Sequence, residues 1–430
     1  MRLPRRGKHS RKLTTLQTRS SAIMLISNLS NRRAESAEGV SSSIVRPAIV
    51  FVALYTATGA WFPYIPLYYR SIGIGVESIG LLAALWAGVA VVSAPVWGAV
   101  ADRIGSVRVP LVAAGLVSAS AAAALAFATE PLVVAGLVAV IGAGNSGLVP
   151  LLDSRTLDIV GESRERYGRV RAWGSIAFIG ASIGVGLLLD RTGPRGLFLV
   201  MVPAVLLTAV AAYVLLGEGR RTEVRRLPWS LSQLGFLRQR RLGLFFVGCV
   251  LLWATTAAVS TFLSVRIADL GGSSQLVGYA WALGAAVEVP IMFSYPVLVR
   301  RFGAERLLVA AALAYVVRST LFALTTDPVI LVALTPLSGV GFALFQVGVV
   351  TYVARSAPTG VRATAQALFS GTAFSLGSIA GSTLGGQLAG LVGLGRLFGV
   401  AALGALIAAG VIWWAIVPTR GQVESRLADA

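Results

Sequence analysis

Four charged side chains interrupt apolar stretches of this 430-residue chain, and their chemistry is the most distinctive in the sequence. Glu288 and Arg318 lie near the middle of two such stretches, and Asp153 and Arg171 lie near the ends of two others. A charge inside a membrane helix costs free energy, so it usually faces the interior of a bundle or an aqueous passage. There, a carboxylate close to a guanidinium can exchange a proton or hold a polar solute.

The depths of Glu288 and Arg318 allow an ion pair between them. Glu288 lies 10 residues before the end of its stretch, near residue 298, and Arg318 lies 11 residues after the start of the next, near residue 307. At about 1.5 Å per helical residue, both side chains are roughly 15 Å deep. Two interpretations stay open: a proton or substrate site, or a structural pair that fixes one helix against the next.

Asp153 and Arg171 form a second candidate pair, closer to the membrane surface. The hairpin that joins their two stretches centres near Glu162, and each residue lies nine positions from that centre. The two side chains therefore lie at similar depth. The pair either binds a solute or is an interfacial pair that terminates two helices.

Twelve apolar stretches must position these side chains. Each is about as long as a helix that crosses the hydrocarbon core, and in lipid the backbone can satisfy its hydrogen bonds in few other ways. The charged fraction of 13%, against about 25% in soluble domains, supports an integral membrane protein. The approximate ranges are 47–69, 77–100, 109–128, 131–155, 171–189, 197–216, 242–264, 275–298, 307–325, 328–353, 363–389 and 397–417.

The net charge of +19 is distributed unevenly between the two sides of these stretches. Past the first stretch, the connectors on one side and the C-terminal tail hold 21 Lys and Arg residues, whereas the connectors on the other side hold five. This bias places both termini in the cytoplasm and predicts a multi-pass protein of the cell membrane. Because topology accounts for the basic residues, we expect the lipid bilayer as a partner and no nucleic acid.

Cysteine and histidine are too rare to support several kinds of site. Cys249 is the single cysteine, and His9, the single histidine, lies outside the apolar stretches. A disulfide framework, a cysteine-ligated metal and a histidine proton relay are therefore excluded. Without clustered acids or a membrane histidine, an active site is hard to build. We expect a monomer that is not an enzyme and that holds no cofactor and no metal.

The two halves of the chain resemble each other at an offset of 198 residues. Arg103, Gly105 and Arg108 follow the second stretch as Arg301, Gly303 and Arg306 follow the eighth. Two similar six-helix bundles around a central pathway form a known transporter architecture. The predicted division is a basic tail over 1–44 that starts at Met1 or Met24, a bundle over 45–216, a linker over 217–241, a bundle over 242–418 and a tail over 419–430.

The segment from Gly98 to Arg108 has the pattern G-x-x-x-D-R-x-G-x-x-R and lies between the second and third stretches. It resembles the signature loop of the major facilitator superfamily. Gly98 permits close helix approach and Gly105 a tight turn, and Asp102 can sit against a helix N-terminus. The resemblance implies that this gating loop, which includes Arg103, clasps the start of the eleventh helix when the cytoplasmic gate is closed.

Three further segments resemble proton symporters related to lactose permease and phenylpropionate permease. They are Tyr167–Ser175, Gly59–Pro66 and the stretch from Gly278 to Arg318. The resemblance implies the major facilitator fold and alternating access of two six-helix halves.

The resemblance also assigns roles, with departures. In the sugar branch, an acid on the fourth helix and an arginine on the fifth hold the substrate, and Asp153 and Arg171 match them. Phe178 stands where that branch stacks its substrate on a tryptophan. Glu288 looks more like the phenylpropionate branch. Ser338 replaces the family's histidine on the tenth helix, so any proton coupling falls on Glu288 or Asp153.

Aromatic residues in the first stretch give a further hypothesis. Pro63 and Pro66 interrupt the helix there, and such breaks line cavities or mark gates. Trp61 and Tyr64 could stack on a planar or sugar-like solute. The alternative is an aromatic belt at the membrane surface.

Together these observations predict an all-α integral membrane protein of the major facilitator fold, with 12 transmembrane helices in two pseudo-symmetric bundles. We expect a secondary active transporter that takes up a small organic solute, such as a sugar, nucleoside or aromatic acid, with protons. Glu288 and Arg318 would couple the protons. An efflux antiporter, an uncoupled facilitator, a membrane sensor and a membrane-embedded enzyme are the alternatives. The predicted substrate-binding residues are Asp153, Arg171, Phe178, Trp61 and Tyr64.

Overall fold

The computed structural model describes residues 44–161, 164–217, 239–356, 366 and 368–416. Within these ranges the chain is helical and has no strand. The predicted tails, with both candidate starts Met1 and Met24, and nearly all of the predicted linker over 217–241 lie outside the described residues.

The N-terminal bundle begins with a helical span over Ile44–Ser71, which is interrupted at residues 62–64 and resumes as α2 (Ile65–Ser71). Pro66 is near the start of α2, so the break falls where the prolines predicted it. The remaining helices are α3 (Val76–Ile104), α4 (Arg108–Leu125), α5 (Pro131–Val160), α6 (Arg164–Thr192), the short η1 (Pro194–Gly196) and α7 (Leu197–Leu215).

The C-terminal bundle follows the same order of long helices. Pro336 interrupts the tenth predicted stretch, which divides into two helices. The π-helical turn η3 precedes α14 in the eleventh. The helices are α8 (Arg240–Asp269), α9 (Ser274–Phe302), α10 (Ala304–Leu324), α11 (Pro328–Ala333), α12 (Pro336–Ser356), η3 (Leu368–Ala373), α14 (Phe374–Val392) and α15 (Leu394–Ile416).

Eleven helical spans in the described residues are long and apolar enough to cross a membrane. The remaining predicted span, the eleventh, contains α14, a 19-residue helix rich in glycine and serine. The 12-helix prediction agrees with this arrangement, and the chain is a multi-pass membrane protein. Helices α5 and α6 extend beyond the predicted stretches 131–155 and 171–189, because charged residues continue the helices past the apolar segment.

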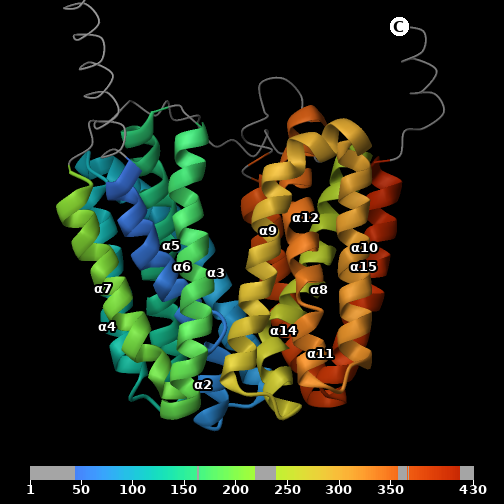
Figure 1. The fold of residues 1–430 in the computed structure, drawn as a ribbon, viewed down its shortest axis with the longest axis horizontal. Coiled ribbons are helices and arrows are strands. Elements are labelled where there is room, and N and C mark those ends of the chain that lie inside the picture. The colour runs from blue at the N-terminus through green and yellow to red at the C-terminus, as the bar shows by residue number, and fades with distance from the viewer. Residues whose placement is uncertain (1–43, 162–163, 218–238, 357–365, 367, 417–430) are drawn as a thin grey trace, which may run out of the picture.

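The two bundles meet at one face of the molecule and diverge toward the other (Figure 1). We call the face with the turns at residues 72–75, 193 and 270–273 the hairpin face, and the opposite one, where residues 217 and 239 lie, the connector face. One hydrophobic core fills the N-terminal bundle and continues into the hairpin-face ends of α8, α9, α14 and α15. A second core lies within the C-terminal bundle alone.

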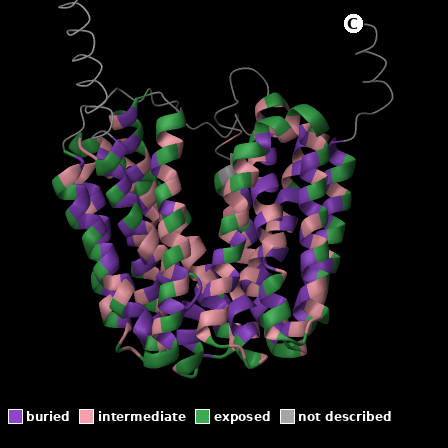
Figure 2. Ribbon diagram, in the orientation of Figure 1, coloured by how far each residue is buried: buried purple, intermediate pink, exposed green. Residues whose placement is uncertain are grey.

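Polar contacts join the bundles at the hairpin face. Arg70 pairs with Asp269 across the boundary. The Asp190 carboxylate at the end of α6 accepts hydrogen bonds from the backbone N–H groups of Ser274 and Gln275, at 2.8 and 3.3 Å, and so caps the start of α9. Buried residues span both bundles at this level (Figure 2).

Candidate functional site

The Arg171 guanidinium on α6 lies over aromatic rings of the first span. Its Cζ atom is 4.4 Å from the ring centroid of Tyr55 and 5.6 Å from that of Phe51. A Cβ atom at Gly174, three residues further along α6, would lie 2.9 Å from Tyr55 Cδ2, so glycine makes room for the ring. The contact is a cation–π interaction that holds the charge without neutralising it.

Asp153 on α5 joins Arg171 in a polar cluster that also contains Tyr55 and Tyr167. Among the described residues, Asp153 and Arg171 form no ion pair, although they interact electrostatically. One carboxylate oxygen of Asp153, Oδ1, is buried and has no hydrogen-bond partner. The structure thus brings the predicted pair into one cluster and leaves both charges with capacity for a ligand.

The alternative interpretation, in which Asp153 and Arg171 terminate two helices, is wrong. Helix α5 continues to Val160, seven residues past Asp153, and α6 begins at Arg164, seven residues before Arg171. Both side chains therefore lie two turns inside their helices.

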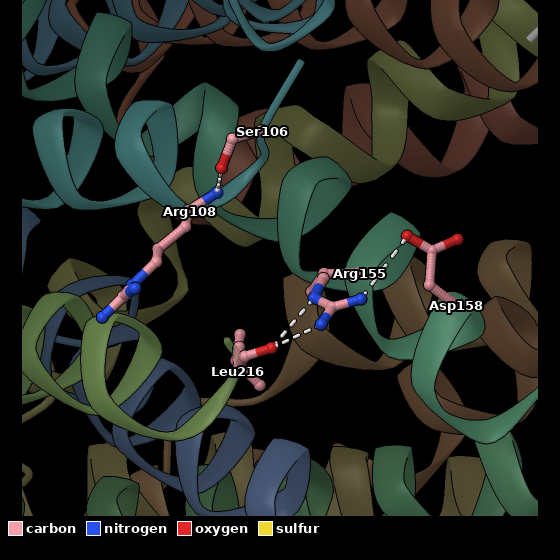
Figure 3. Close-up of polar contacts among 5 residues, drawn as sticks. All are labelled: Ser106, Arg108, Arg155, Asp158 and Leu216. Atoms are coloured by element: carbon pink, nitrogen blue, oxygen red, sulfur yellow. Dashed lines mark hydrogen bonds and ion pairs between the residues drawn. The ribbon is translucent and has the colours of Figure 1, made fainter. Parts of the chain in front are cut away.

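Other arginines hold the connector-face end of the N-terminal bundle together (Figure 3). Arg155 donates from Nε and Nη2 to the carbonyl oxygen of Leu216, at 3.0 and 2.6 Å, and also lies 3.8 Å from Asp158. This contact satisfies a carbonyl at the end of α7. The Arg108 guanidinium lies 3.7 Å from the ring centroid of Tyr213 on α7. These groups stabilise helix ends and are distinct from the polar cluster.

The predicted gating loop lies at the same end of the bundle and includes Arg108. Gly105 ends α3 with φ of 72°, the left-handed conformation that a tight turn needs. Gly98 does not show the predicted close approach, because no other atom lies within 4 Å of where its Cβ would be. Arg103 is exposed, and Asp102 is partly buried. Most of residues 357–367, where the eleventh stretch begins, lie outside the described residues, so the clasp by Asp102 stays a prediction.

Glu288 and Arg318 do not form the ion pair that their depths allow. Among the described residues Glu288 has no ion pair and no hydrogen bond, and its side chain is partly exposed. Arg318 is only 1% exposed, and its guanidinium lies 4.8 Å from the ring centroid of Tyr315. Tyr315 interacts electrostatically with both charges. The two residues thus share a neighbour, as their similar depths predicted, but they are not within ion-pair distance of each other.

The surroundings of Arg318 leave several polar atoms without partners. Its Nη2 donates to the Ser319 hydroxyl at 3.2 Å, whereas its Nε has no partner. The buried hydroxyls of Tyr315 and of Thr256 on α8 interact with each other, but at a geometry outside that of an ordinary hydrogen bond. Buried polar groups are normally paired, so this cluster keeps unused hydrogen-bonding capacity in the conformation described.

An aromatic pair crosses between the bundles. Phe178 on α6 meets Trp281 on α9, with ring centroids 6.5 Å apart and planes at 62°. Both side chains are partly buried. Arg171 precedes Phe178 by seven residues, and Glu288 follows Trp281 by seven, so each charge lies on the same helix face as its ring. Both charges are displaced from the pair by about 10.5 Å toward the connector face.

Trp61 and Tyr64 lie closer to the hairpin face and are enclosed. Trp61 is 3% exposed and stacks on Trp86 of α3 at 5.2 Å between centroids. The Tyr64 hydroxyl donates to the carbonyl oxygen of Ser182 and lies against Gly278 of α9. This conformation closes both rings off from solvent, so their contact with a solute stays a prediction.

Sequence reasoning missed Tyr55, Tyr167, Trp281, Tyr315 and Asp190. For Tyr167 a signal existed, because it lies four residues before Arg171 and so on the same helix face. The same seven-residue spacing that links Phe178 to Arg171 could have drawn attention to Trp281 beside Glu288. The contacts of Tyr55 and Asp190 depend on how separate helices pack, and no local pattern reveals them.

Comparison with known proteins shows the same fold and class. Residues 44–400 match the model of the MFS_1 like family. The chain is 29% identical to a maltose permease of Geobacillus stearothermophilus, over 79% of this chain and 86% of the relative. It is 30% identical to a probable 3-phenylpropionic acid transporter of Escherichia coli, over 65% and 74%. The crystal structure of the nucleoside transporter NupG (D323A mutant) superposes with a TM-score of 0.78 at 17% identity, over 87% of this chain and 100% of that one.

Proposed function

Because this chain belongs to the major facilitator superfamily and is a secondary transporter, not an enzyme, we propose that it takes up a small organic solute together with protons. One observation carries the proposal: Glu288 has no ion pair with any other residue that the structure describes, and it lies deep in the membrane on the face of α9 that meets the other bundle. A carboxylate held there is costly when charged, and binding a proton removes that cost.

The polar cluster of the N-terminal bundle would hold the solute. Arg171 and Asp153 form no ion pair with each other among the described residues, and Asp153 Oδ1 has no hydrogen-bond partner, so both groups can still bind a ligand. Hydroxyl, carboxylate and amide groups of a solute can bind a guanidinium and a carboxylate at the same time. Tyr55 and Tyr167 support both charged groups from the sides.

Coupling would arise when the connector face closes. Closure brings α9 toward α6 and removes water from around Glu288, which disfavours the charged carboxylate. A proton that Glu288 binds from the outside would cross with the solute and leave into the cytoplasm when the connector face opens. The empty carrier would then return unprotonated, with the Glu288 charge balanced by Arg318, so that each cycle carries a proton inward. Arg318 and Tyr315 would respond to the change of charge, because Tyr315 interacts with both ionisable groups.

The connector face would be the cytoplasmic one. The loops at this face carry most of the basic residues in the spanning region, as the positive-inside bias requires. The structure, joined at the hairpin face, would then be the form that exchanges solute with the cytoplasm of the cell.

The solute would be a sugar, a nucleoside or an aromatic acid. Relatives of this chain include a maltose permease and a probable 3-phenylpropionic acid transporter, and the fold matches that of a nucleoside transporter. Maltose, 3-phenylpropionate and uridine are therefore the first probes to assay.

Glu288→Gln tests the proposal in proteoliposomes. We expect the variant to exchange solute across the membrane at a rate within about threefold of wild type, while accumulation driven by a pH gradient is lost, because an amide cannot carry a proton. Glu130→Gln, an exposed residue just before α5, is the matched control and should accumulate normally.

Two results would contradict the proposal. If the Glu288→Gln protein still accumulates solute along a pH gradient, Glu288 is not the coupling group. If wild type equilibrates the probes but never accumulates them, the protein is an uncoupled facilitator.

A further inference from the structure

Asp153 and Arg171 stay apart, although their opposite charges attract each other. The two groups interact electrostatically, and both side chains are partly buried in the N-terminal bundle, where water screens charges weakly. A carboxylate and a guanidinium that meet in such a place form short, charge-assisted hydrogen bonds. Among the described residues these two do not. Another group must therefore hold at least one of the side chains in place.

Two aromatic rings of the first span hold the guanidinium of Arg171. Its Cζ atom lies 4.4 Å from the ring centroid of Tyr55 and 5.6 Å from that of Phe51. The two rings lie one helical turn apart and stack on each other, with centroids 6.1 Å apart and planes at 12°. A ring face attracts a cation more strongly where water is excluded. The rings therefore compete with the carboxylate for the guanidinium.

The Tyr55 ring is itself fixed by packing against α6. A Cβ atom at Gly174 would lie 2.9 Å from Cδ2 and 3.2 Å from Cγ of this ring. Because Gly174 follows Arg171 by three residues, the ring lies against the α6 backbone on the helix face that carries the guanidinium. The position of the ring thus depends on the space at Gly174 and not on the charge alone.

The carboxylate of Asp153 has a hydrogen bond left to make. Its Oδ1 atom is buried and has no partner, although Tyr167 interacts with the same side chain. A buried acceptor without a donor costs free energy. An ion pair with Arg171 would supply that donor, so the separation of the two groups is not the arrangement that stability alone favours. A use for the free groups explains it better.

We propose that Tyr55 is a positioning residue that holds Arg171 away from Asp153, so that both groups stay available to the solute. The proposal rests on the proposed transport function, because the solute is what would use the two groups. Without the ring, the guanidinium would turn to Asp153 and form the ion pair. A solute would then have to break that pair before it could bind, and its affinity would fall.

A double-mutant cycle tests the proposal without any solute. The cycle combines Asp153→Asn with Arg171→Gln and is read from the melting temperature of detergent-purified protein. It measures how far the effects of the two substitutions fail to add. We expect this coupling to be about threefold or more larger in a Tyr55→Leu background than in wild type, because the ion pair forms there. Tyr55→Phe, which keeps a ring, should leave the coupling as it is in wild type.

A second variant reaches the same ring from the other helix. Gly174→Ala takes the space of the Tyr55 ring without changing Tyr55, so the coupling should rise as it does in Tyr55→Leu. Gly180→Ala on the same helix is the matched control, because a Cβ atom there meets no atom within 4 Å. Phe62→Leu is the control on the first span, since that ring contacts Trp86 instead. Both controls should show the coupling of wild type.

Uptake into proteoliposomes separates this role from the transport proposal. For the probe that wild type transports, among maltose, 3-phenylpropionate and uridine, we expect Tyr55→Leu to raise KM by about tenfold and to keep the maximal rate within about threefold. Tyr55→Phe should keep the KM of wild type. If wild type transports none of the three probes, that result counts against the transport proposal, and the cycle still decides the role of Tyr55.

Three results would overturn this role. The first is equal coupling between Asp153 and Arg171 in Tyr55→Leu and in wild type. The second is a rise in Tyr55→Phe as large as that in Tyr55→Leu, which would show that the ring is not what holds the guanidinium. The third is an unchanged KM in Tyr55→Leu.

Discussion

Arg318 is among the largest fully buried side chains of the described residues, and it carries a charge. It lies 4.8 Å from the Tyr315 ring centroid and 5.9 Å from that of Phe322, and among the described residues no carboxylate forms an ion pair with it. A buried charge without a partner lowers stability. Its retention in the middle of α10 is therefore better explained by function than by structure.

Substitution of Arg318 separates these two roles. We expect Arg318→Met to melt at a temperature no lower than wild type, because an apolar side chain of similar length removes an unpaired buried charge. We also expect solute accumulation to fall by about tenfold or more, because the variant loses the positive charge that would respond to the protonation of Glu288. Arg306→Met at the exposed start of the same helix is the control. A large drop in melting temperature would instead identify Arg318 as a structural residue.

At the level of single residues, the sequence predicted which charges lie inside the helices and how deep they lie, but not what they touch. Counting residues along a helix gives depth directly. Rotation about the helix axis depends on the packing of neighbouring helices, so equal depth allowed an ion pair between Glu288 and Arg318 but could not decide whether it forms, and it does not. For the same reason the sequence did not predict the contact of Arg171 with Tyr55, for which Gly174 provides the space.

Helix ends supply polar contacts between the bundles at the hairpin face. The last turn of α6 and the first turn of α9 are joined by the Asp190 carboxylate, which accepts from two backbone N–H groups of α9. An N-cap of this kind contributes about 0.5–2 kcal/mol. Because the donor and acceptor belong to different bundles, that free energy stabilises the closed hairpin face.

Removal of this cap should loosen the hairpin face. In a Cys249→Ser background, a cysteine at Ser182, which is 0% exposed beneath the contact, reports opening by its rate of maleimide labelling. We expect Asp190→Ala to raise that rate by roughly threefold or more, as the loss of a cap predicts. Asp327→Ala is the matched control, because Asp327 caps α11 within one bundle. Equal rates in both variants would show that Asp190 does not hold the bundles together.

At the level of helices, hydropathy predicted most spans well and failed where polar residues continue a helix. The predicted stretch 197–216 agrees with α7 to within one residue, whereas 171–189 missed the first seven residues of α6. Those residues include Arg166 and Arg169, which leave the apolar core while the backbone stays helical. The break at residues 62–64 was predictable because the prolines cannot donate a backbone hydrogen bond.

On the scale of the whole molecule, the two hydrophobic cores show at which face the bundles are closed against each other. One core joins both bundles at the hairpin face, and the second stays within the C-terminal bundle. The internal repeat with its offset of 198 residues predicted two bundles, but a repeat cannot tell which face is closed. That depends on side-chain contacts such as Arg70 with Asp269 and Tyr64 with Ser182.

The central claim is that the two bundles rock about a solute held between them. Pulsed electron spin resonance of two label pairs in a Cys249→Ser background tests it most directly. One pair, at the exposed positions 103 and 301, reports the connector face, and the other, at 71 and 268, reports the hairpin face. We expect the solute that binds to shorten the first distance while it lengthens the second, because alternating access opens one face as the other closes. If both distances change in the same sense, or neither changes when solute is bound, the account is contradicted.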